Sequence, residues 1–65
     1  MPSTAIAFTH YDEQSQTLKV GFVTGRVYNY LQVPKTVYAE MQKAFSKGTF
    51  VNRYIKGHFN YQEVK

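Results

Sequence analysis

The spacing of the apolar residues changes once along this chain, near Val33-Pro34. Before this point apolar residues tend to alternate with polar ones, which is typical of strands with one buried face. After it they recur at intervals of three and four residues, which is typical of amphipathic helices. The change predicts an α+β fold, in which a three-stranded antiparallel meander sheet is followed by two helices packed on one of its faces.

The alternating half divides into three expected strands, separated by a polar run and by a glycine turn. The expected strands cover residues 6–11, 17–23 and 26–33. The turn between the second and third strands lies at Thr24-Gly25, because glycine accepts the positive φ that such a turn requires.

The length of that turn decides which face of the sheet receives Tyr28 and Tyr30. A two-residue turn places both rings on the outer face, where they would form a stacking platform for RNA bases. A three-residue loop with Gly25 in a bulge places them opposite Val20 and Leu18 on the core face, since a one-residue slip inverts the face. We favour the bulged loop, because it joins the tyrosines to an existing apolar surface.

The first predicted helix follows Val33, and Pro34 suits its first position. One apolar stripe marks its buried face: Val37, Tyr38, Met41, Ala44 and Phe45. Lys43 and Lys47 lie on the opposite side, and Gly48 is expected to end the helix.

The second predicted helix is shorter, with Thr49 expected to cap it and Gly57 to end it. Its apolar side consists of Phe50, Val51, Tyr54 and Ile55. Its polar side consists of Asn52, Arg53 and Lys56.

The 65 residues suffice for one domain, which we place at 1–65 with frayed ends at 1–3 and 62–65. A core of this size seldom supplies more than about 3–5 kcal/mol. The chain has no cysteine, so the six tyrosines and five phenylalanines must provide the packing that disulfides cannot. No apolar run approaches the roughly 18 residues of a membrane span. The start of the chain lacks a signal peptide, so we expect a cytoplasmic protein.

The residues that could support catalysis are few and scattered. The four carboxylates form no recognisable acid–base pair, and His10 and His58 belong to different elements. With no cysteine and only a thin set of His and Asp side chains, a metal site is not expected. The four glycines are isolated and form no phosphate-binding loop. We therefore expect a non-enzymatic binding module without a cofactor.

The net positive charge of the chain comes entirely from its second half. Residues 1–32 carry two cations and two anions, whereas residues 33–65 carry six cations and two anions, which accounts for the net charge of +4. This asymmetry suggests an anionic partner, although a net charge of this size is also ordinary for a soluble domain.

A nucleic acid is the first partner that this charge suggests. The candidate phosphate contacts are Lys43, Lys47, Arg53 and Lys56, with Asn52 as a polar contact. They would form one surface if the two helices pack side by side; otherwise they are solvated helix faces. Tyr28 and Tyr30 would join them only if their rings face solvent. The alternative function is protein interaction through a sheet edge or an apolar patch.

Several short sequence features, each present once, follow one another in a characteristic order and spacing. They are Ser3 with Ile6, Tyr11-Asp12, Leu18-x-Val20-x-Phe22, Gly25, Tyr28-x-Tyr30, Val33-Pro34, Val37-Tyr38, Ala44, Ser46-x-Gly48, Asn52 and Ile55. With this order and spacing the chain resembles the KTSC domain, a module named for its occurrence at the C-terminus of some lysyl-tRNA synthetases. The resemblance runs from about Ser3 to Tyr61. It implies a small domain for which RNA binding, to tRNA or a similar RNA, has been suggested from the synthetase context.

The chain departs from the family pattern at two places. Phe50-Val51 stands where the pattern has a Tyr-Phe pair before an Asn, and Phe59-Asn60-Tyr61 stands where Tyr-Pro-Tyr is usual. The hydroxyl groups expected at positions 50 and 59 are therefore missing. A packing role for these two rings remains, whereas a role for their hydroxyls does not.

Overall fold

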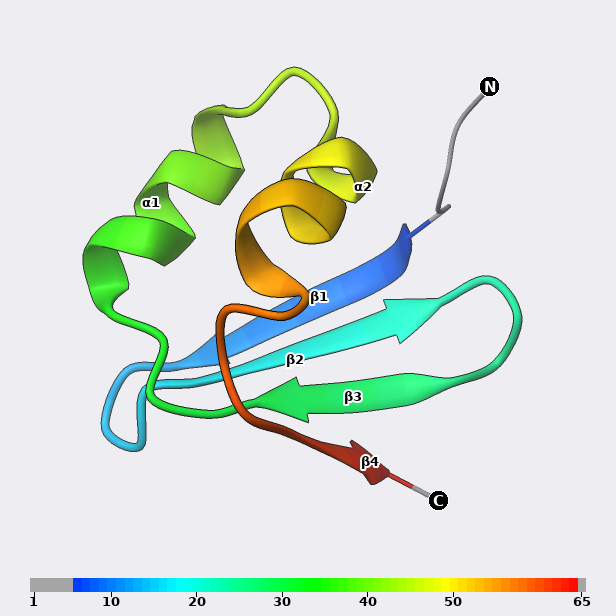
Figure 1. Ribbon diagram of the computed structural model, residues 1–65, viewed down its shortest axis with the longest axis horizontal. Helices are drawn as coiled ribbons and strands as arrows, with labels where there is room; N and C mark the ends of the chain where they lie inside the picture. The colour runs from blue at the N-terminus through cyan, green and yellow to red at the C-terminus, as the bar shows by residue number, and fades with distance from the viewer. Residues whose placement is uncertain (1–5, 65) are drawn as a thin grey trace.

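The computed structural model describes residues 6–64. The chain forms a four-stranded antiparallel sheet with helices over one face (Figure 1). The strands cross the sheet in the order of the sequence, β1-β2-β3-β4. Their bounds are Ile6–Asp12 for β1, Thr17–Phe22 for β2, Val27–Tyr30 for β3 and Tyr61–Val64 for β4. The α+β class is confirmed, whereas the predicted three-stranded sheet is wrong by one strand.

The register between β2 and β3 is the bulged one. The pairs are Val20 with Tyr28 and Leu18 with Tyr30. The loop that sets this register is closed by two backbone hydrogen bonds. The Phe22 N–H donates to the Arg26 carbonyl (2.8 Å), and the Gly25 N–H donates to the Phe22 carbonyl (2.9 Å). Gly25 has φ 98°, where a side chain would be strained. The core-facing orientation of the two tyrosines is therefore confirmed.

The strand β3 stops at Tyr30, three residues before its predicted end. The next backbone donors go to loops: the Leu31 N–H bonds the Asn60 carbonyl and the Val33 N–H bonds the Gln16 carbonyl, each at 2.8 Å. The apolar alternation breaks at Tyr30-Leu31, where two apolar residues adjoin, and Gln32 has φ 57°, so the chain leaves the sheet before Val33.

The fourth strand, β4, corrects the prediction that residues 62–65 are frayed. Its pairs with β3 run from Tyr61 opposite Tyr30 to Val64 opposite Val27, so residues 62–64 are part of the sheet. Residues 1–3, also predicted to be frayed, and residue 65 lie outside the described residues. β3 stabilises β4 through backbone hydrogen bonds, and four residues are too few for a clear alternating signal.

The helix α1 (Lys35–Lys43) follows Pro34, which is its N-cap rather than its first helical residue. The prediction that Gly48 ends this helix is wrong. Ala44 has an extended backbone (ψ 141°), and its N–H bonds the Met41 carbonyl, so the helix stops one turn earlier. Because the chain straightens there, Phe45 leaves the predicted buried stripe and is fully exposed.

The second helical segment consists of α2 (Lys47–Phe50) and a π-helical turn, η1 (Val51–Ile55), without a break. Ser46, not the predicted Thr49, is its N-cap: the Thr49 N–H donates to the Ser46 hydroxyl at 3.2 Å. The predicted end near Gly57 is confirmed by its φ of 80°. The predicted burial of Tyr54 is wrong, because about half of this residue is exposed.

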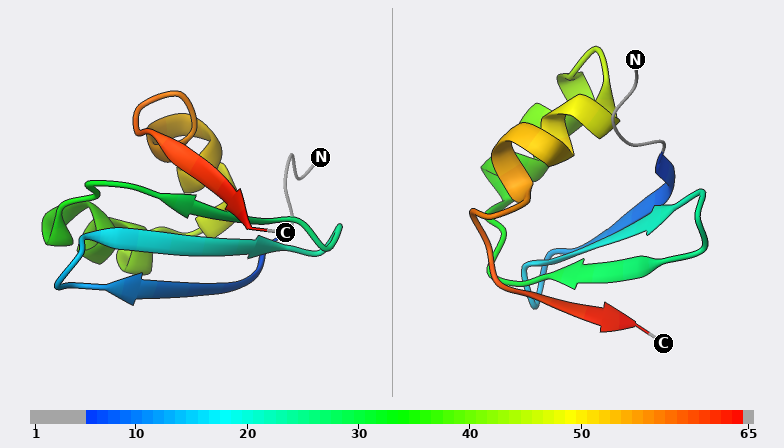
Figure 2. Two further views of the ribbon diagram at one scale, coloured as in Figure 1. Left: turned by 90° about the horizontal axis from the view of Figure 1, so that it is seen from below. Right: turned by 45° about the vertical axis from the view of Figure 1, so that its right-hand side comes forward.

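The core lies between the sheet and the helical segments. Its buried side chains are Leu18, Val20, Phe22, Tyr30, Val33, Met41, Val51 and Ile55. The Tyr11 ring stacks on Tyr38 with centroids 4.6 Å apart, and its hydroxyl donates to the Val33 carbonyl at 2.6 Å, so β1 is fastened to α1. Figure 2 shows both helical segments on the same side of the sheet. No helix within residues 6–64 is long and apolar enough to cross a membrane.

Candidate nucleic-acid interface

A tyrosine-lined hollow of about 370 Å³ opens between the inner face of the sheet and the end of η1. We call it the tyrosine pocket, and its lining residues are Tyr28 and Tyr30 of β3, Lys56 and Gly57 after η1, and Tyr61 of β4. Since Tyr30 pairs with Tyr61, the rings of both strands emerge on the same face. The positive φ of Gly57 lets the chain turn back from η1 toward β4.

The three rings of the pocket contact one another. Tyr28 and Tyr61 meet edge to face, with centroids 5.4 Å apart and an interplanar angle of 82°. The centroids of Tyr30 and Tyr61 are 5.9 Å apart, and those of Tyr28 and Tyr30 are 6.4 Å apart. Tyr30 is 2% exposed and Tyr61 59% exposed, with Tyr28 between them. Tyr30 therefore forms the floor, while Tyr28 and Tyr61 offer ring surface to a ligand.

Two cationic side chains, Lys56 and Arg26, lie beside the aromatic rings of the tyrosine pocket. The Lys56 ammonium lies 5.8 Å from the centre of the Phe22 ring, a cation–π contact. The Arg26 guanidinium donates to the Tyr28 hydroxyl at 3.5 Å and lies 3.8 Å from the Glu63 carboxylate. The pocket thus combines ring faces, phenol hydroxyls and positive charge.

The pocket raises the pKa of two of its groups, the Tyr30 phenol and the Arg26 guanidinium. Burial raises the pKa of the Tyr30 phenol above its ordinary value of 10.0, and the nearby Tyr28 and Tyr61 phenols raise it further. The hydrogen bond to Tyr28 raises the pKa of Arg26, and the charges of Tyr28 and Glu63 add to this effect. The Tyr30 phenol is neutral at neutral pH with or without this shift, so it can both donate and accept hydrogen bonds.

Three of the seven predicted site residues come together in this pocket: Tyr28, Tyr30 and Lys56. Arg53 lies elsewhere, since it lines a separate hollow of about 300 Å³ with Phe45 and Tyr54. Of the four helical cations predicted to share one surface, only Lys56 therefore lines this pocket.

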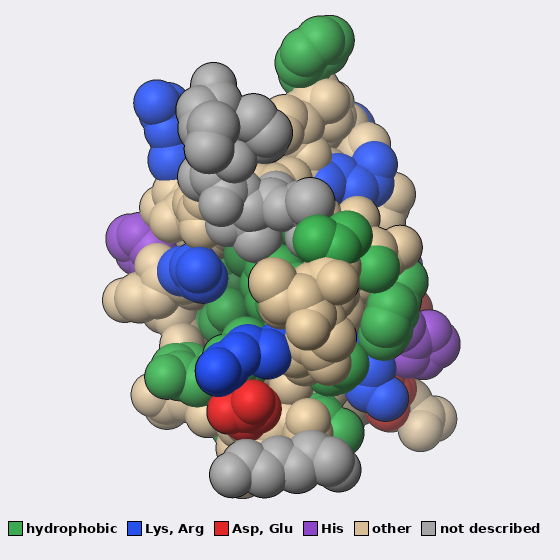
Figure 3. Space-filling model, turned by 90° about the vertical axis from the view of Figure 1, so that its right-hand side faces the viewer, with side chains coloured by type: hydrophobic (Ala, Val, Ile, Leu, Met, Phe, Trp, Pro, Cys, Tyr) green, Lys and Arg blue, Asp and Glu red, His purple; other side chains and the backbone are tan. Residues whose placement is uncertain are grey.

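The other predicted residues are spread along the helical segments. Lys43 is exposed at the end of α1, Lys47 is exposed at the start of α2, and Asn52 is half-buried within η1. On the face shown in Figure 3, basic side chains are scattered among hydrophobic and uncharged surface, and one of them lies against an acidic side chain. A common basic surface formed by these helical residues stays a prediction.

Sequence reasoning missed Tyr61 and Arg26 as site residues. The aromatic tail was visible in the sequence, but the contact of Tyr61 with Tyr28 depends on β4, which was not predicted. Arg26 is two residues before Tyr28, a spacing that places two side chains on one face of an extended chain. The spacing of Arg26 and Tyr28 indicates a shared site only once the structure shows which face of the sheet Tyr28 occupies.

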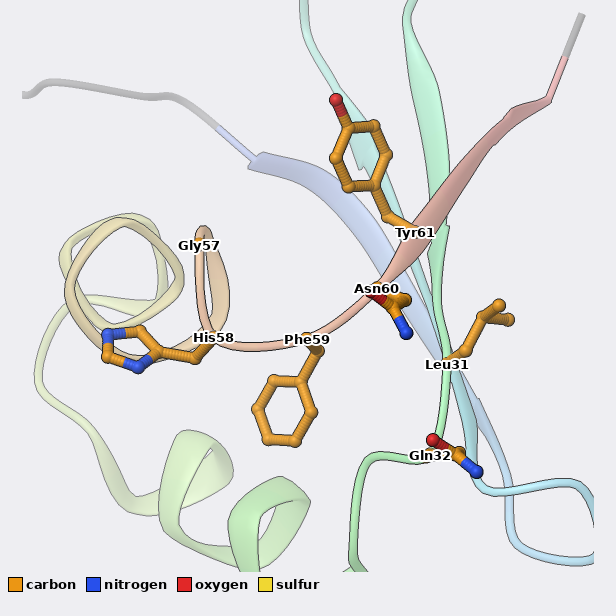
Figure 4. Close-up of a pocket in the computed structure, with 7 residues that line it drawn as sticks. All are labelled: Leu31, Gln32, Gly57, His58, Phe59, Asn60 and Tyr61. Atoms are coloured by element: carbon orange, nitrogen blue, oxygen red, sulfur yellow. The ribbon is translucent and has the colours of Figure 1, made fainter.

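A second hollow, of about 440 Å³, adjoins the segment 57–61 and shares Gly57 and Tyr61 with the tyrosine pocket. Its other lining residues are Leu31, Gln32, His58, Phe59 and Asn60. In Figure 4 the side chains of Leu31 and His58 point away from each other, so the lining groups do not converge on one point. Within residues 6–64, no group of three or more His, Cys, Asp or Glu side chains could hold a metal ion. We therefore centre the candidate site on the tyrosine pocket.

Comparisons with known proteins agree with one another on the family. The model of the KTSC domain family matches residues 2–59. A solved KTSC domain protein from Yersinia pestis has the same fold, with a TM-score of 0.86, 31% identity, and coverage of 100% of this chain and 94% of that one.

The related sequences include both long and short proteins. A lysine–tRNA ligase of Trichormus variabilis is 43% identical over 54 residues, which are 83% of this chain and 10% of the ligase. A protein of Tsukamurella paurometabola is 39% identical over 57 residues, 88% of this chain and 85% of its own length. The chain thus spans about a tenth of the lysine–tRNA ligase it matches.

Proposed function

The chain belongs to the KTSC domain family, and from this membership and the tyrosine pocket we propose that it is a non-enzymatic module that binds single-stranded RNA. The observation that carries the proposal is that one hollow contains the accessible ring surface of Tyr28 and Tyr61 together with Lys56. Proteins that bind single-stranded nucleic acid combine stacking aromatic side chains with positive charge along the backbone.

The exposed ring of Tyr61 would stack an unpaired base, and the Tyr28 ring, which meets it edge to face, would support it from the side. Tyr61 exposes more than half of its surface, and its edge-to-face contact with Tyr28 holds it in one orientation. A ring that is already ordered loses little conformational freedom when a base stacks on it. The hydroxyls of the pocket would then contact the edge of the base or the ribose.

The cations at the pocket would contact the phosphates that flank this base. Lys56 lines the pocket, and Arg26 reaches its rim through the Tyr28 hydroxyl. The predicted helical residues would extend the phosphate contacts beyond the pocket: Lys43, Lys47, Asn52 and Arg53. Related lysine–tRNA ligases carry a domain of this kind, which supports RNA as the ligand and the cytoplasm as its location.

Binding to a labelled single-stranded RNA and to tRNA, measured across a salt series, tests this function. The five cations named above predict a log–log slope near −3.5, at roughly −0.7 per contact on a single strand. Lys56→Gln should lower the magnitude of the slope by about 0.7.

Lys35→Gln is the matched control for that variant. It also removes one positive charge, but Lys35 pairs with Glu13 at 3.2 Å, away from the pocket. Absence of binding by the unmodified protein at low salt would refute RNA binding. An unchanged slope in Lys56→Gln would remove the pocket from the site.

Protein interaction is the second candidate, and one observation favours it. Phe45, Phe50 and Tyr54 form an aromatic patch on the outside of the helical segments, with Phe45 fully exposed and the other two rings 4.9 Å apart. Exposed aromatic surface of this kind marks many interaction sites. Salt-insensitive self-association in sedimentation, lost in Phe45→Ser, would support this function.

A further inference from the structure

The face of the sheet opposite the helices carries two rows of side chains that cross all four strands. The register aligns a polar row, which consists of His10, Lys19, Asn29 and Gln62. It also aligns a neighbouring row with less polar side chains, which consists of Phe8, Gly21, Val27 and Val64. Among the described residues no helix covers this face, as Figure 2 shows, and we call it the open face.

The Phe8 ring is held flat against the open face by the absence of a side chain at position 21. A Cβ atom on Gly21 would overlap three atoms of the Phe8 ring, so the ring occupies the space over the glycine backbone. Phe8 nevertheless remains 48% exposed. The ring is thus supported from below and available from above, which is the arrangement that base stacking requires.

The polar row has unused capacity for hydrogen bonds and charge pairing. Asn29 Oδ1 is buried and has no hydrogen-bond partner among residues 6–64. Lys19, directly opposite in the register, forms no ion pair with any described residue. The nearby Asp12 carboxylate accepts the Gln14 N–H at 3.1 Å, which holds it toward the turn. This row therefore favours a ligand that carries negative charge and hydrogen-bond donors.

We propose that the open face binds further nucleotides of the same single-stranded RNA, with one base stacked on Phe8. Lys19 contacts a phosphate, and the Asn29 and Gln62 amides contact base edges once the atoms that cover Asn29 Oδ1 rearrange. This inference rests on the proposed function. Tyr61 and Gln62 are consecutive residues of the edge strand β4, and their side chains lie on opposite faces of the sheet. A single RNA chain can therefore pass from the tyrosine pocket around β4 to the open face.

The composition of the open face favours RNA over a protein partner. A protein-binding sheet face is expected to be dominated by apolar side chains at its centre. Here the central position of the polar row holds a lysine and an asparagine, next to an aromatic ring. Aromatic, amide and basic side chains on an open sheet are the groups that recognise splayed single-stranded bases.

Three variants in an RNA-binding titration test this inference, with an oligonucleotide of about twelve residues as the probe. Phe8→Leu keeps an apolar cover over Gly21 but removes the stacking ring, and it should weaken binding about tenfold. Phe8→Tyr keeps the ring and should bind as tightly as the unmodified protein. Lys19→Gln should lower the magnitude of the salt slope by about 0.7, whereas the matched control Lys35→Gln should not.

The outcomes separate this inference from the proposed function. If the unmodified protein binds and Tyr61→Ala weakens binding while Phe8→Leu and Lys19→Gln do not, the open face is refuted and the tyrosine pocket stands. If the unmodified protein binds no RNA, both fail. If Phe8→Leu abolishes self-association in sedimentation and leaves RNA affinity unchanged, the open face binds protein and the inference is overturned. Backbone amide shifts on RNA addition at Lys19, Asn29 and Gln62 would support it independently of any substitution.

Discussion

Tyr61 of β4 meets Tyr28 of β3 edge to face, with ring centroids 5.4 Å apart. The two residues are separated by both helical segments in the sequence, so the contact exists only because β4 returns to the sheet beside β3. The same contact closes one side of the tyrosine pocket. The pairing of β4 with β3 therefore both orders residues 61–64 and brings the rings of the candidate site together.

Tyr61→Ala should weaken binding to single-stranded RNA by about 1–3 kcal/mol, because it removes the most exposed ring of the pocket. Tyr61→Phe keeps the ring and should retain most of the affinity. Fluorescence anisotropy with a labelled oligonucleotide measures both variants. Equal affinity of Tyr61→Ala and the unmodified protein would contradict a stacking role.

Ser46→Ala should lower the free energy of unfolding by about 1 kcal/mol, since it removes the side chain that accepts the Thr49 N–H. Thr49→Ala is the matched control and should change stability by only a few tenths of a kcal/mol, because alanine suits a helix. Urea unfolding distinguishes the two. A larger effect at Thr49 would restore the cap that the sequence suggested.

Gly21→Ala should destabilise the fold by about 1–3 kcal/mol, because the added methyl group displaces the Phe8 ring. In a Phe8→Ala background the same substitution should cost much less, since the obstructing ring is gone. A double-mutant cycle from urea unfolding measures this coupling. Additive effects of the two substitutions would show that the ring does not lie over Gly21.

The free energy of unfolding should fall as the pH rises above about 10, and Tyr30 should account for part of this fall. Burial raises the pKa of Tyr30 in the folded state, so the unfolded state loses its proton first. The contribution of Tyr30 is complete below the unfolded pKa and is lost as the pH rises through the higher folded value. Tyr30→Phe should therefore show a shallower decline in urea unfolding above pH 10, and identical declines would contradict the raised pKa.

The hairpin shows how far a local pattern can lead. The sequence predicted the bulged register because only that register places Tyr28 and Tyr30 beside Leu18 and Val20, and the observed pairs confirm it. The helix ends show the opposite case. Gly48 and Thr49 are each plausible as a stop and a cap, but the extended backbone at Ala44 shifts both boundaries, and no local rule ranks these competing signals.

The sequence by itself determined the order of strands and helices and the inner face of the sheet, because these follow from the period of the apolar residues and from where glycine permits a turn. Only the tertiary structure decided the fourth strand, the tyrosine pocket and the rows of the open face. Each of these depends on strands that are distant along the chain becoming neighbours, and backbone pairing leaves little trace in the residues that it joins.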